Sequence, residues 1–249
     1  MWLINTSTYR LEHFIDHTVV KYAILSHTWG DNELLFQDIS GPDGAERARN
    51  NVKVRYTCEQ AKKDGLHYAW IDTCSIDKRS SAELSEGINS MWNYYQAATC
   101  CYAFLVDVDT GKYDNSKFGR LRQRFEDSRW FKRCWTLQEL IAPEEVIFFD
   151  NEWQRVGSRN GLCGIISKAT QIDIQILNTP RQRLSYFSIA KRMSWASHRK
   201  ATRLEDEAYS LLGIFGVNMP MLYGEGRKAF RRLQEEIIRY STDLSIFAW

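Results

Sequence analysis

A carboxylate interrupts the apolar part of a predicted helix in the stretch SRWFKRCWTLQELIAPEEVIFF (128–149). Trp135, Leu140 and Ile141 mark the buried stripe, and Glu139 follows Trp135 by one turn, on the same face. A carboxylate held beside an indole at the mouth of a cleft can offset a developing positive charge or bind sugar hydroxyls. From spacing alone, a structural acid on an ordinary helix stays open as the alternative.

Polar side chains also stand where strand-like runs end. KYAILSHTW (21–29) is a buried-strand pattern, and the residues of interest at its end are Ser26, His27, Trp29, Gly30 and Asp31. Asp72 lies inside a second strand-like run, AWIDTCSI (69–76). Because ligands of open parallel sheets gather beyond the carboxyl ends of strands, we expect a binding site there. For Asp72, a structural hydrogen bond to a loop stays open beside a ligand role, since a buried carboxylate needs a partner.

Other kinds of site receive little support. Adjacent strand residues point to opposite faces, so Ser26 and His27 are poorly placed for a hydrolase triad with Asp72, and no G-x-S-x-G elbow occurs. The five histidines are scattered without H-E-x-x-H spacing, so we expect no metal. GEGRKA (224–229) fits G-x-G-x-x-A but lacks a surrounding βαβ unit, which favours a turn and helix start over a dinucleotide site.

Composition narrows the class of protein. The net charge is +2 and no run of five basic residues occurs, so the footprint of a nucleic-acid binder is missing. No apolar run approaches ~18 residues and the N-terminus does not resemble a signal peptide, so we expect no membrane segment. The six cysteines form no C-x-x-C pair, which favours a reducing, cytoplasmic compartment.

The elements that position these residues alternate along the chain. Residues 1–14 read as a strand or short hairpin, residues 33–50 as a loop and residues 109–127 as a polar connection. Four strands are expected at 21–29, 66–76, 99–108 and 144–150, and the helices between them at 52–65, after a capping box at Ser80, and in the opening stretch. This alternation predicts an α/β fold with a parallel sheet covered on both faces. Residues 159–249 read as helices, and we expect a helical extension packed on a 1–158 core within a single domain.

Several motifs together resemble the heterokaryon incompatibility (HET) domain of filamentous fungi. They include YAILSHTWGD (22–31), YAWIDTCSIDK (68–78), SRWFKRCWTLQELIAP (128–143) and the block 192–237. The resemblance covers essentially the whole chain. It implies a cell-death effector of non-self recognition, fused to or partnered with a sensor or a nucleotide-binding oligomerisation module.

The first 150 residues also resemble, more distantly, a Toll/interleukin-receptor (TIR) domain, which has a flavodoxin-like parallel sheet. SRWFKRCWTLQEL is similar to the TIR element S-x-W-C-x-x-E-L, which carries the catalytic Glu of NAD-cleaving members. Counted from Trp135, the acid comes four residues later and Leu140 follows it, which selects Glu139. The chain departs from the element because Cys134 precedes Trp135 instead of following it.

The TIR resemblance implies a reaction. Glu139 would be the catalytic carboxylate of an NAD glycohydrolase, with NAD as substrate, no cofactor, and activity on self-association into a homo-oligomer. The residues implied to contact substrate are Ser26, His27, Trp29, Gly30, Asp31, Asp72 and Trp135. The alternative is a non-enzymatic signalling module that associates through its surfaces, as adaptor-type TIR domains do. In that case Glu139 is a structural helix residue.

Overall fold

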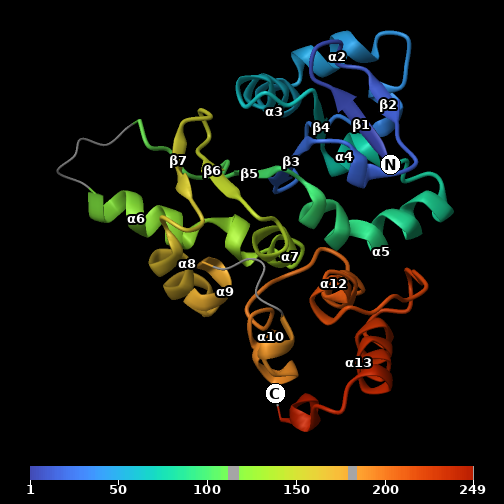
Figure 1. The fold of residues 1–249 in the computed structure, drawn as a ribbon, viewed down its shortest axis with the longest axis vertical. Coiled ribbons are helices and arrows are strands. Elements are labelled where there is room, and N and C mark those ends of the chain that lie inside the picture. The colour runs from blue at the N-terminus through green and yellow to red at the C-terminus, as the bar shows by residue number, and fades with distance from the viewer. Residues whose placement is uncertain (112–117, 179–183, 249) are drawn as a thin grey trace.

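The computed structural model describes residues 1–111, 118–178 and 184–248. One seven-stranded sheet has the order β2-β1-β4-β3-β5-β6-β7 (Figure 1). The four central strands run parallel and are β4 (Tyr68–Trp70), β3 (Tyr22–His27), β5 (Cys100–Phe104) and β6 (Val146–Phe149). The outer strands pair antiparallel and are β1 (Trp2–Asn5), β2 (Leu11–His13) and β7 (Arg155–Ser158).

The α/β class is confirmed, whereas the prediction of an all-parallel sheet is wrong at both edges. The N-terminal residues form the β1–β2 hairpin that their alternation allowed, and this hairpin joins the sheet antiparallel to β4. At the other edge, residues 150–154 connect β6 directly to β7. A connection this short joins only antiparallel strands, since a parallel partner needs a crossover of a dozen or more residues.

Helices cover both faces of the sheet, as expected. All residues of β3 and β5 are buried, which is the pattern of strands with helices on either side. One face packs against α1 (Phe36–Ile39), α2 (Gly44–Asn50) and α3 (Val52–Lys63). The other face packs against α5 (Ser81–Ala97), α7 (Thr136–Ile141) and the helices that follow (Figure 1).

Residues 33–50 are not the predicted loop, because they contain α1 and α2. Only Ile39, Gly44 and Ala48 of these two short helices are buried, so the polar surface hid their periodicity. Gly44 sits where a Cβ would lie 1.9 Å from the Ile39 carbonyl oxygen, so the close contact between the helices requires glycine. Helix α3 ends as predicted before Gly65, whose φ of 76° favours glycine.

The second predicted strand is shorter than expected. Strand β4 ends at Trp70, and Asp72 opens a short helix, α4 (Asp72–Ser75), instead of lying inside the strand. The chain turns here because Ser75 bonds to the Ile71 backbone through both its hydroxyl (3.3 Å) and its N–H (2.8 Å). Helix α5 starts at the predicted cap, where the Ser80 hydroxyl accepts from the Glu83 N–H (3.2 Å).

The opening stretch forms two short helices instead of one. A 3₁₀ turn, η3 (Arg129–Lys132), precedes α7, and α6 (Phe118–Asp127) lies in the predicted polar connection, of which residues 112–117 fall outside the described chain. The helix is interrupted because the chain pairs with Lys200 as a short parallel bridge. The Cys134 N–H donates to the Lys200 carbonyl (3.0 Å), and the Lys200 N–H donates to the Lys132 carbonyl (2.7 Å).

The second half of the chain is mainly helical after β7. Its helices are α8 (Cys163–Thr170), α9 (Ile174–Asn178), α10 (Ile189–Ser194), α11 (Asp206–Tyr209), α12 (Leu212–Phe215) and α13 (Lys228–Tyr240). Their buried residues belong to the same hydrophobic cluster as α5, β5 and β6. Gly213 lets α12 approach α5, since a Cβ there would lie 2.2 Å from Cβ of Trp92. A boundary at residue 158 stays a prediction.

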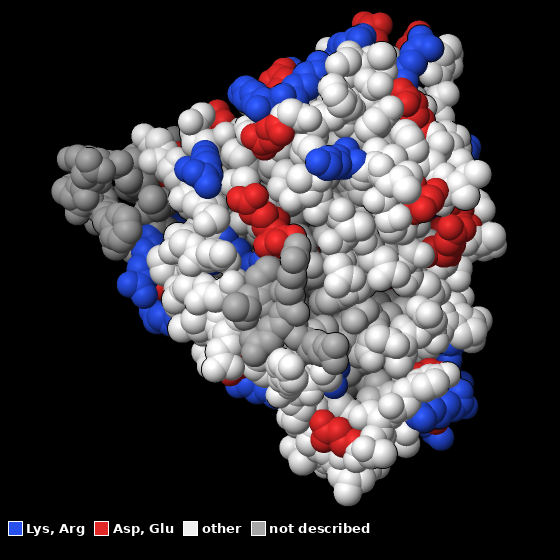
Figure 2. All heavy atoms as spheres, viewed as in Figure 1, with Lys and Arg blue, Asp and Glu red and all other residues white. Residues whose placement is uncertain are grey.

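The described helices include none that combines the length and apolar character needed to cross a bilayer. On the face drawn in Figure 2, lysine and arginine side chains alternate with acids among uncharged residues.

Candidate functional site

Ser26, at the carboxyl end of β3, joins the sheet to the acid of α7. Its hydroxyl donates to Glu139 Oε2, and the Trp130 indole N–H donates to the same hydroxyl oxygen (2.8 Å). An indole nitrogen can only donate, so Ser26 accepts from Trp130 and directs its own proton to Glu139. Both Ser26 and Trp130 are fully buried. This relay holds the Glu139 carboxyl group in one position.

Burial is the largest influence on the pKa of Glu139, a residue that is only 8% exposed. Desolvation raises the pKa of Glu139 to about 8, and the charge of Asp72 acts in the same direction. Hydrogen bonds from Ser26 and Tyr95 act in the opposite direction, as does the positive charge of Arg199. Glu139 is therefore largely protonated at neutral pH unless a cation enters its surroundings.

Glu139 lies on the wall of a cavity of about 350 Å³. Five predicted site residues share this cavity, namely His27, Trp29, Asp72, Trp135 and Glu139. They come from the ends of β3 and β4 and from α7. The strand order switches at β3. The next strand along the chain, β4, lies on one side of β3, and the following strand, β5, lies on the other. Such a switch point is where open α/β sheets bind ligands.

His27 hydrogen-bonds to one acid and lies near a second at the cavity edge. Its Nε2 lies 3.1 Å from Glu33 Oε2, and its Nδ1 lies 3.8 Å from Asp72 Oδ1. Burial alone would raise the pKa of Glu33, but hydrogen bonds and charge from His27 and Lys53 lower this pKa to about 2. The Gly30 N–H donates to Glu33 as well (2.7 Å). The charged Glu33 carboxylate therefore joins His27, Gly30 and Lys53 and orders the loop after β3.

Three residues predicted to contact substrate do not line the cavity, namely Ser26, Gly30 and Asp31. Ser26 is fully buried and bonds to Glu139, whereas Gly30 and Asp31 are exposed. The role of Gly30 is the loop contact to Glu33 just described. The described hydrogen bonds also do not join Ser26 to His27, which agrees with the argument against a triad.

Trp29 and Lys78 form one rim of the cavity. Trp29 Nε1 donates to Asp72 Oδ2 (2.8 Å), and the Lys78 ammonium lies 3.5 Å from the centroid of the Trp29 ring. Trp29 is 52% exposed, so the stacked pair stands at the entrance. Asp72 is thus a structural partner of Trp29 and a cavity residue at the same time, which keeps both sequence interpretations in place.

The helical second half supplies the opposite wall. Asp206 Oδ1 accepts from the Tyr223 hydroxyl (2.9 Å), and the Asp206 carboxylate also accepts from Trp135. Arg203 stacks on the Tyr223 ring at 4.7 Å, and Arg133 Nη1 donates to the Thr202 hydroxyl (2.9 Å). Burial raises the pKa of Asp206. The cavity therefore needs both halves of the chain.

The glycine turn 224–226 is already occupied by an acid of the protein. The N–H groups of Gly224 and Gly226 both donate to Glu205 Oε1, at 2.8 and 2.9 Å. Both glycines have positive φ, 104° and 59°. Turns of this kind hold anions, and here the anion is a buried carboxylate from the residue preceding Asp206. The interpretation of GEGRKA as a turn and helix start is confirmed.

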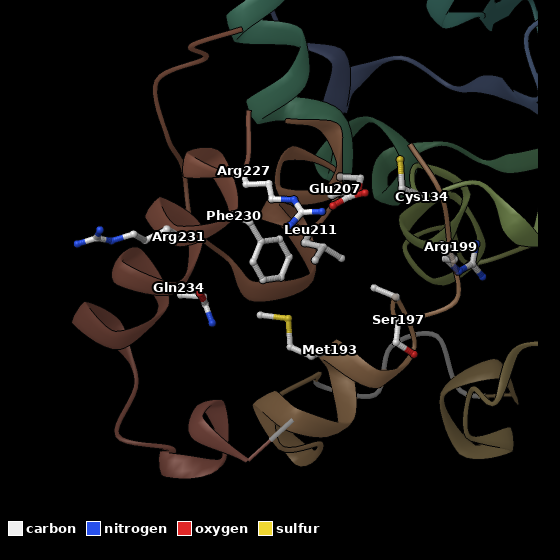
Figure 3. A pocket seen from close by; sticks show the side chains of 12 residues that line it. Cys134, Met193, Ser197, Arg199, Glu207, Leu211, Arg227, Phe230, Arg231 and Gln234 are labelled. Carbon is white, nitrogen blue, oxygen red and sulfur yellow. The ribbon is translucent and has the colours of Figure 1, made fainter. Parts of the chain in front are cut away.

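Arg199 lines a second cavity, which has a volume of about 410 Å³ (Figure 3). Its apolar lining includes Met193, Leu211 and Phe230, whereas the Arg199 guanidinium points away from these side chains. Arg199 Nη1 donates to the Thr136 hydroxyl in α7 (2.8 Å). Arg199 is buried, which lowers its pKa to about 10, so it stays protonated. It lines the second cavity and bonds to Thr136, which lines the first.

Sequence reasoning missed the residues that join this site from a distance. The sequence patterns assign no role to Trp130, Lys78, Arg199, Asp206 or Tyr223. Asp206 stands in the block resembling a HET domain, which is the one signal that could have selected it. Among the described residues, no group of three or more His, Cys, Asp or Glu side chains is arranged to hold a metal ion.

Comparisons with known proteins agree with the motifs. Residues 22–117 match the family model described as heterokaryon incompatibility protein (HET), and residues 228–249 match a domain of unknown function (DUF8212). The chain is 46% identical over 222 residues to the vegetative incompatibility protein HET-E-1 of Podospora anserina. The match covers 88% of this chain and 16% of that protein. No solved structure matches. The chain therefore carries a domain of the heterokaryon incompatibility family.

Proposed function

We propose that this chain is a cell-death effector of fungal non-self recognition and that it hydrolyses NAD in the Glu139 cavity. The vegetative incompatibility relative supports the biological role. The observation that carries the chemistry is the buried Glu139 carboxyl group on the cavity wall, oriented by Ser26 and Trp130. We place this activity in the cytoplasm.

The sheet topology supports the resemblance to TIR domains. In chain order, the four parallel strands lie in the order second, first, third, fourth. This is the order of flavodoxin-like sheets, whose ligands bind beyond the carboxyl ends of the strands beside the first strand. Ser26 and His27 end that first strand, and Asp72 follows the second. Glu139 precedes the fourth strand, as the resemblance expects.

The proposed reaction breaks the bond between the ribose C1′ and the nicotinamide nitrogen. The bonding electrons return to the positively charged pyridinium nitrogen, so nicotinamide leaves neutral and needs no general acid. Positive charge grows on the ribose as in glycoside hydrolysis. The Glu139 carboxylate stabilises that charge and holds ribose hydroxyls. Water then adds to C1′ and gives its proton to Glu139, which yields ADP-ribose.

The raised pKa of Glu139 suits a cationic substrate. Burial keeps the acid largely protonated at neutral pH, since its pKa is about 8. An opposite charge within ~4–6 Å favours the ionised form of an acid. The nicotinamide ring carries such a charge, so its arrival would lower the pKa of Glu139 and release a proton. The carboxylate then forms where it is needed.

The test is nicotinamide release by the concentrated or artificially oligomerised protein, because we propose that self-association activates it. Wild type is compared with Glu139→Gln and Glu139→Ala. Glu59→Gln serves as the matched control, since Glu59 is exposed on α3, across the sheet from the cavity. We expect release by wild type and the control, and loss in both Glu139 variants. No release by assembled wild type, or equal release by folded Glu139 variants, favours the non-enzymatic signalling module.

A further inference from the structure

Lys78 has an unusual ammonium group for a residue of the proposed NAD cavity. It lies in the segment between α4 and α5 and lines the cavity together with Glu139. Its Nζ atom is buried and has no hydrogen-bond partner among the described residues. The atom lies over the face of the Trp29 ring, 3.5 Å from its centroid.

An ammonium group has three donors, and burying it without acceptors is costly. Burial is the largest influence on Lys78 and lowers its pKa, although four acidic groups oppose this effect, namely Asp72, Cys74, Glu33 and Asp206. Two of these acids have other partners. Asp72 accepts from Trp29 (2.8 Å), and Glu33 binds His27 (3.1 Å) and Lys53. The donors of Lys78 are therefore available to a ligand.

The other cations of the cavity differ from Lys78. Arg133 donates to Thr202 (2.9 Å), and Arg203 is exposed and stacks on Tyr223 (4.7 Å). Lys78 combines burial, charge and unused donors, and it stands beside an exposed aromatic ring at the entrance. Such a group binds an anion that enters from solvent.

The surroundings of Lys78 indicate which anion. The cavity that Lys78 lines also has apolar residues in its lining, namely Ile76, Leu84, Ile88 and Met91. A ligand that satisfies both features has a flat apolar ring system and a compact, strongly charged group. Lysine binds phosphate as a point charge on a flexible stem, without the planar fork by which arginine pairs with carboxylate or phosphate. The chemistry is that of a nucleotide phosphate.

We propose that Lys78 binds a phosphate of the nucleotide substrate, which in the proposed reaction is the pyrophosphate of NAD. The inference rests on the proposed function, because it assigns Glu139 to the nicotinamide ribose and Lys78 to the next group along the same molecule. The Lys78 ammonium would then contact the Trp29 ring and the phosphate at the same time.

The test compares Lys78→Met and Lys78→Arg with wild type on two substrates. A hydrogen bond to a charged group contributes about 1.5–3 kcal/mol, so kcat/KM for NAD should fall about 10- to 100-fold in Lys78→Met. Nicotinamide riboside has no phosphate, and its kcat/KM should change less than about twofold, since only the phosphate contact is removed. Lys78→Arg should recover part of the loss. Lys63→Met, at an exposed position on α3, is the matched charge control.

A binding measurement separates this inference from the proposed reaction. ADP and adenosine are titrated into each variant by calorimetry, after melting curves establish that the variant is folded. We expect ADP affinity to fall in Lys78→Met and adenosine affinity to stay the same. Lys78-dependent ADP binding without NAD cleavage would refute the reaction and support the phosphate site. Equal loss on NAD and nicotinamide riboside, or ADP binding that ignores Lys78, would overturn the inference.

Discussion

Ser26 and Glu139 are hydrogen-bonded across 113 positions of the chain, one at the end of a central strand and the other in the helix that precedes β6. Trp130 fixes the direction of this bond by donating to the serine oxygen at 2.8 Å. The bond favours the ionised acid, while burial favours the neutral acid. The balance between the two makes Glu139 a titrating group near neutral pH.

Glu139→Gln should change the pH dependence of stability. The pKa of Glu139 is about 8 in the folded protein, above its ordinary value of 4.5. Between these values the folded state keeps a proton that the unfolded state has lost, so the free energy of unfolding falls as pH rises, by up to about 1.4 kcal/mol per unit. Glutamine does not titrate. Denaturant unfolding at several pH values should show a shallower slope for the variant, and equal slopes would contradict the assignment.

NAD cleavage should increase with pH across the titration of Glu139. The reaction needs the carboxylate, and the pH profile of kcat/KM reports groups of the free enzyme. We therefore expect kcat/KM to rise and level off with an apparent pKa near the value of about 8 for Glu139. The measurement is nicotinamide release from the assembled protein in buffers of constant ionic strength. A profile that falls over this range would indicate that the protonated acid is the active form.

Ser26→Ala should move that profile to higher pH. The substitution removes a hydrogen bond that stabilises the carboxylate, so the pKa of Glu139 rises further. It also leaves the buried Trp130 N–H without its acceptor, which costs about 1–3 kcal/mol of stability. At pH values well above the apparent pKa of both proteins, kcat/KM of the variant and of wild type should become equal. A variant that is equally impaired at every pH would show that Ser26 does not act through the pKa of Glu139.

Sequence patterns could identify features that are complete within a short stretch. Such local features are the buried runs of β3 and β5, the helix cap at Ser80, and the acid at Glu139 within an apolar helix. The strand pairing at the edges of the sheet could not be predicted, because it depends on contacts between segments that lie far apart in the sequence. The division of the opening stretch follows from its bridge to Lys200, which no local preference contains.

The cavity could be predicted only in part for the same reason. The wall formed by Asp206 and Tyr223 lies more than sixty residues beyond Glu139 in the chain, and its polar residues resemble an ordinary helix start. Lys78 gives no local signal, since its distinguishing property is the lack of a hydrogen-bond partner in the folded protein. The apolar neighbours of Asp72 distinguish it in the sequence, although β4 ends at Trp70 and Asp72 opens α4.

Glu205→Ala should lower the melting temperature more than Glu205→Gln. The Glu205 carboxylate accepts from the N–H groups of Gly224 and Gly226, and these bonds lower its pKa. Glutamine keeps an acceptor oxygen without the charge, whereas alanine leaves both donors without a partner. Exposed Glu207 provides the control, since Glu207→Ala should melt close to wild type. Identical melting of all variants would show that the turn does not depend on Glu205.

Gly213→Ala should destabilise the contact between α12 and α5. The new Cβ would lie 2.2 Å from Cβ of Trp92, and overpacking of this kind typically costs about 1–3 kcal/mol. Gly164→Ala is the matched control in α8, because nothing lies within 4 Å of the added Cβ. That change should stabilise by about 0.4–1 kcal/mol by restricting the unfolded chain. Denaturant unfolding measures both, and similar effects at the two sites would contradict the packing argument.

The parallel pairing of β5 with β6 limits how this protein can be divided. Residues 22–117, which match the family model, contain β3, β4 and β5 but end before β6 and Glu139. Cutting there would remove the acceptors of the Cys101 and Leu105 N–H groups, which donate to Glu145 (2.9 Å) and Phe149 (2.8 Å). The fragment would therefore carry an open, apolar strand edge, and such edges recruit other chains. We therefore expect a fragment of residues 22–117 to associate with other chains instead of folding as a stable monomer.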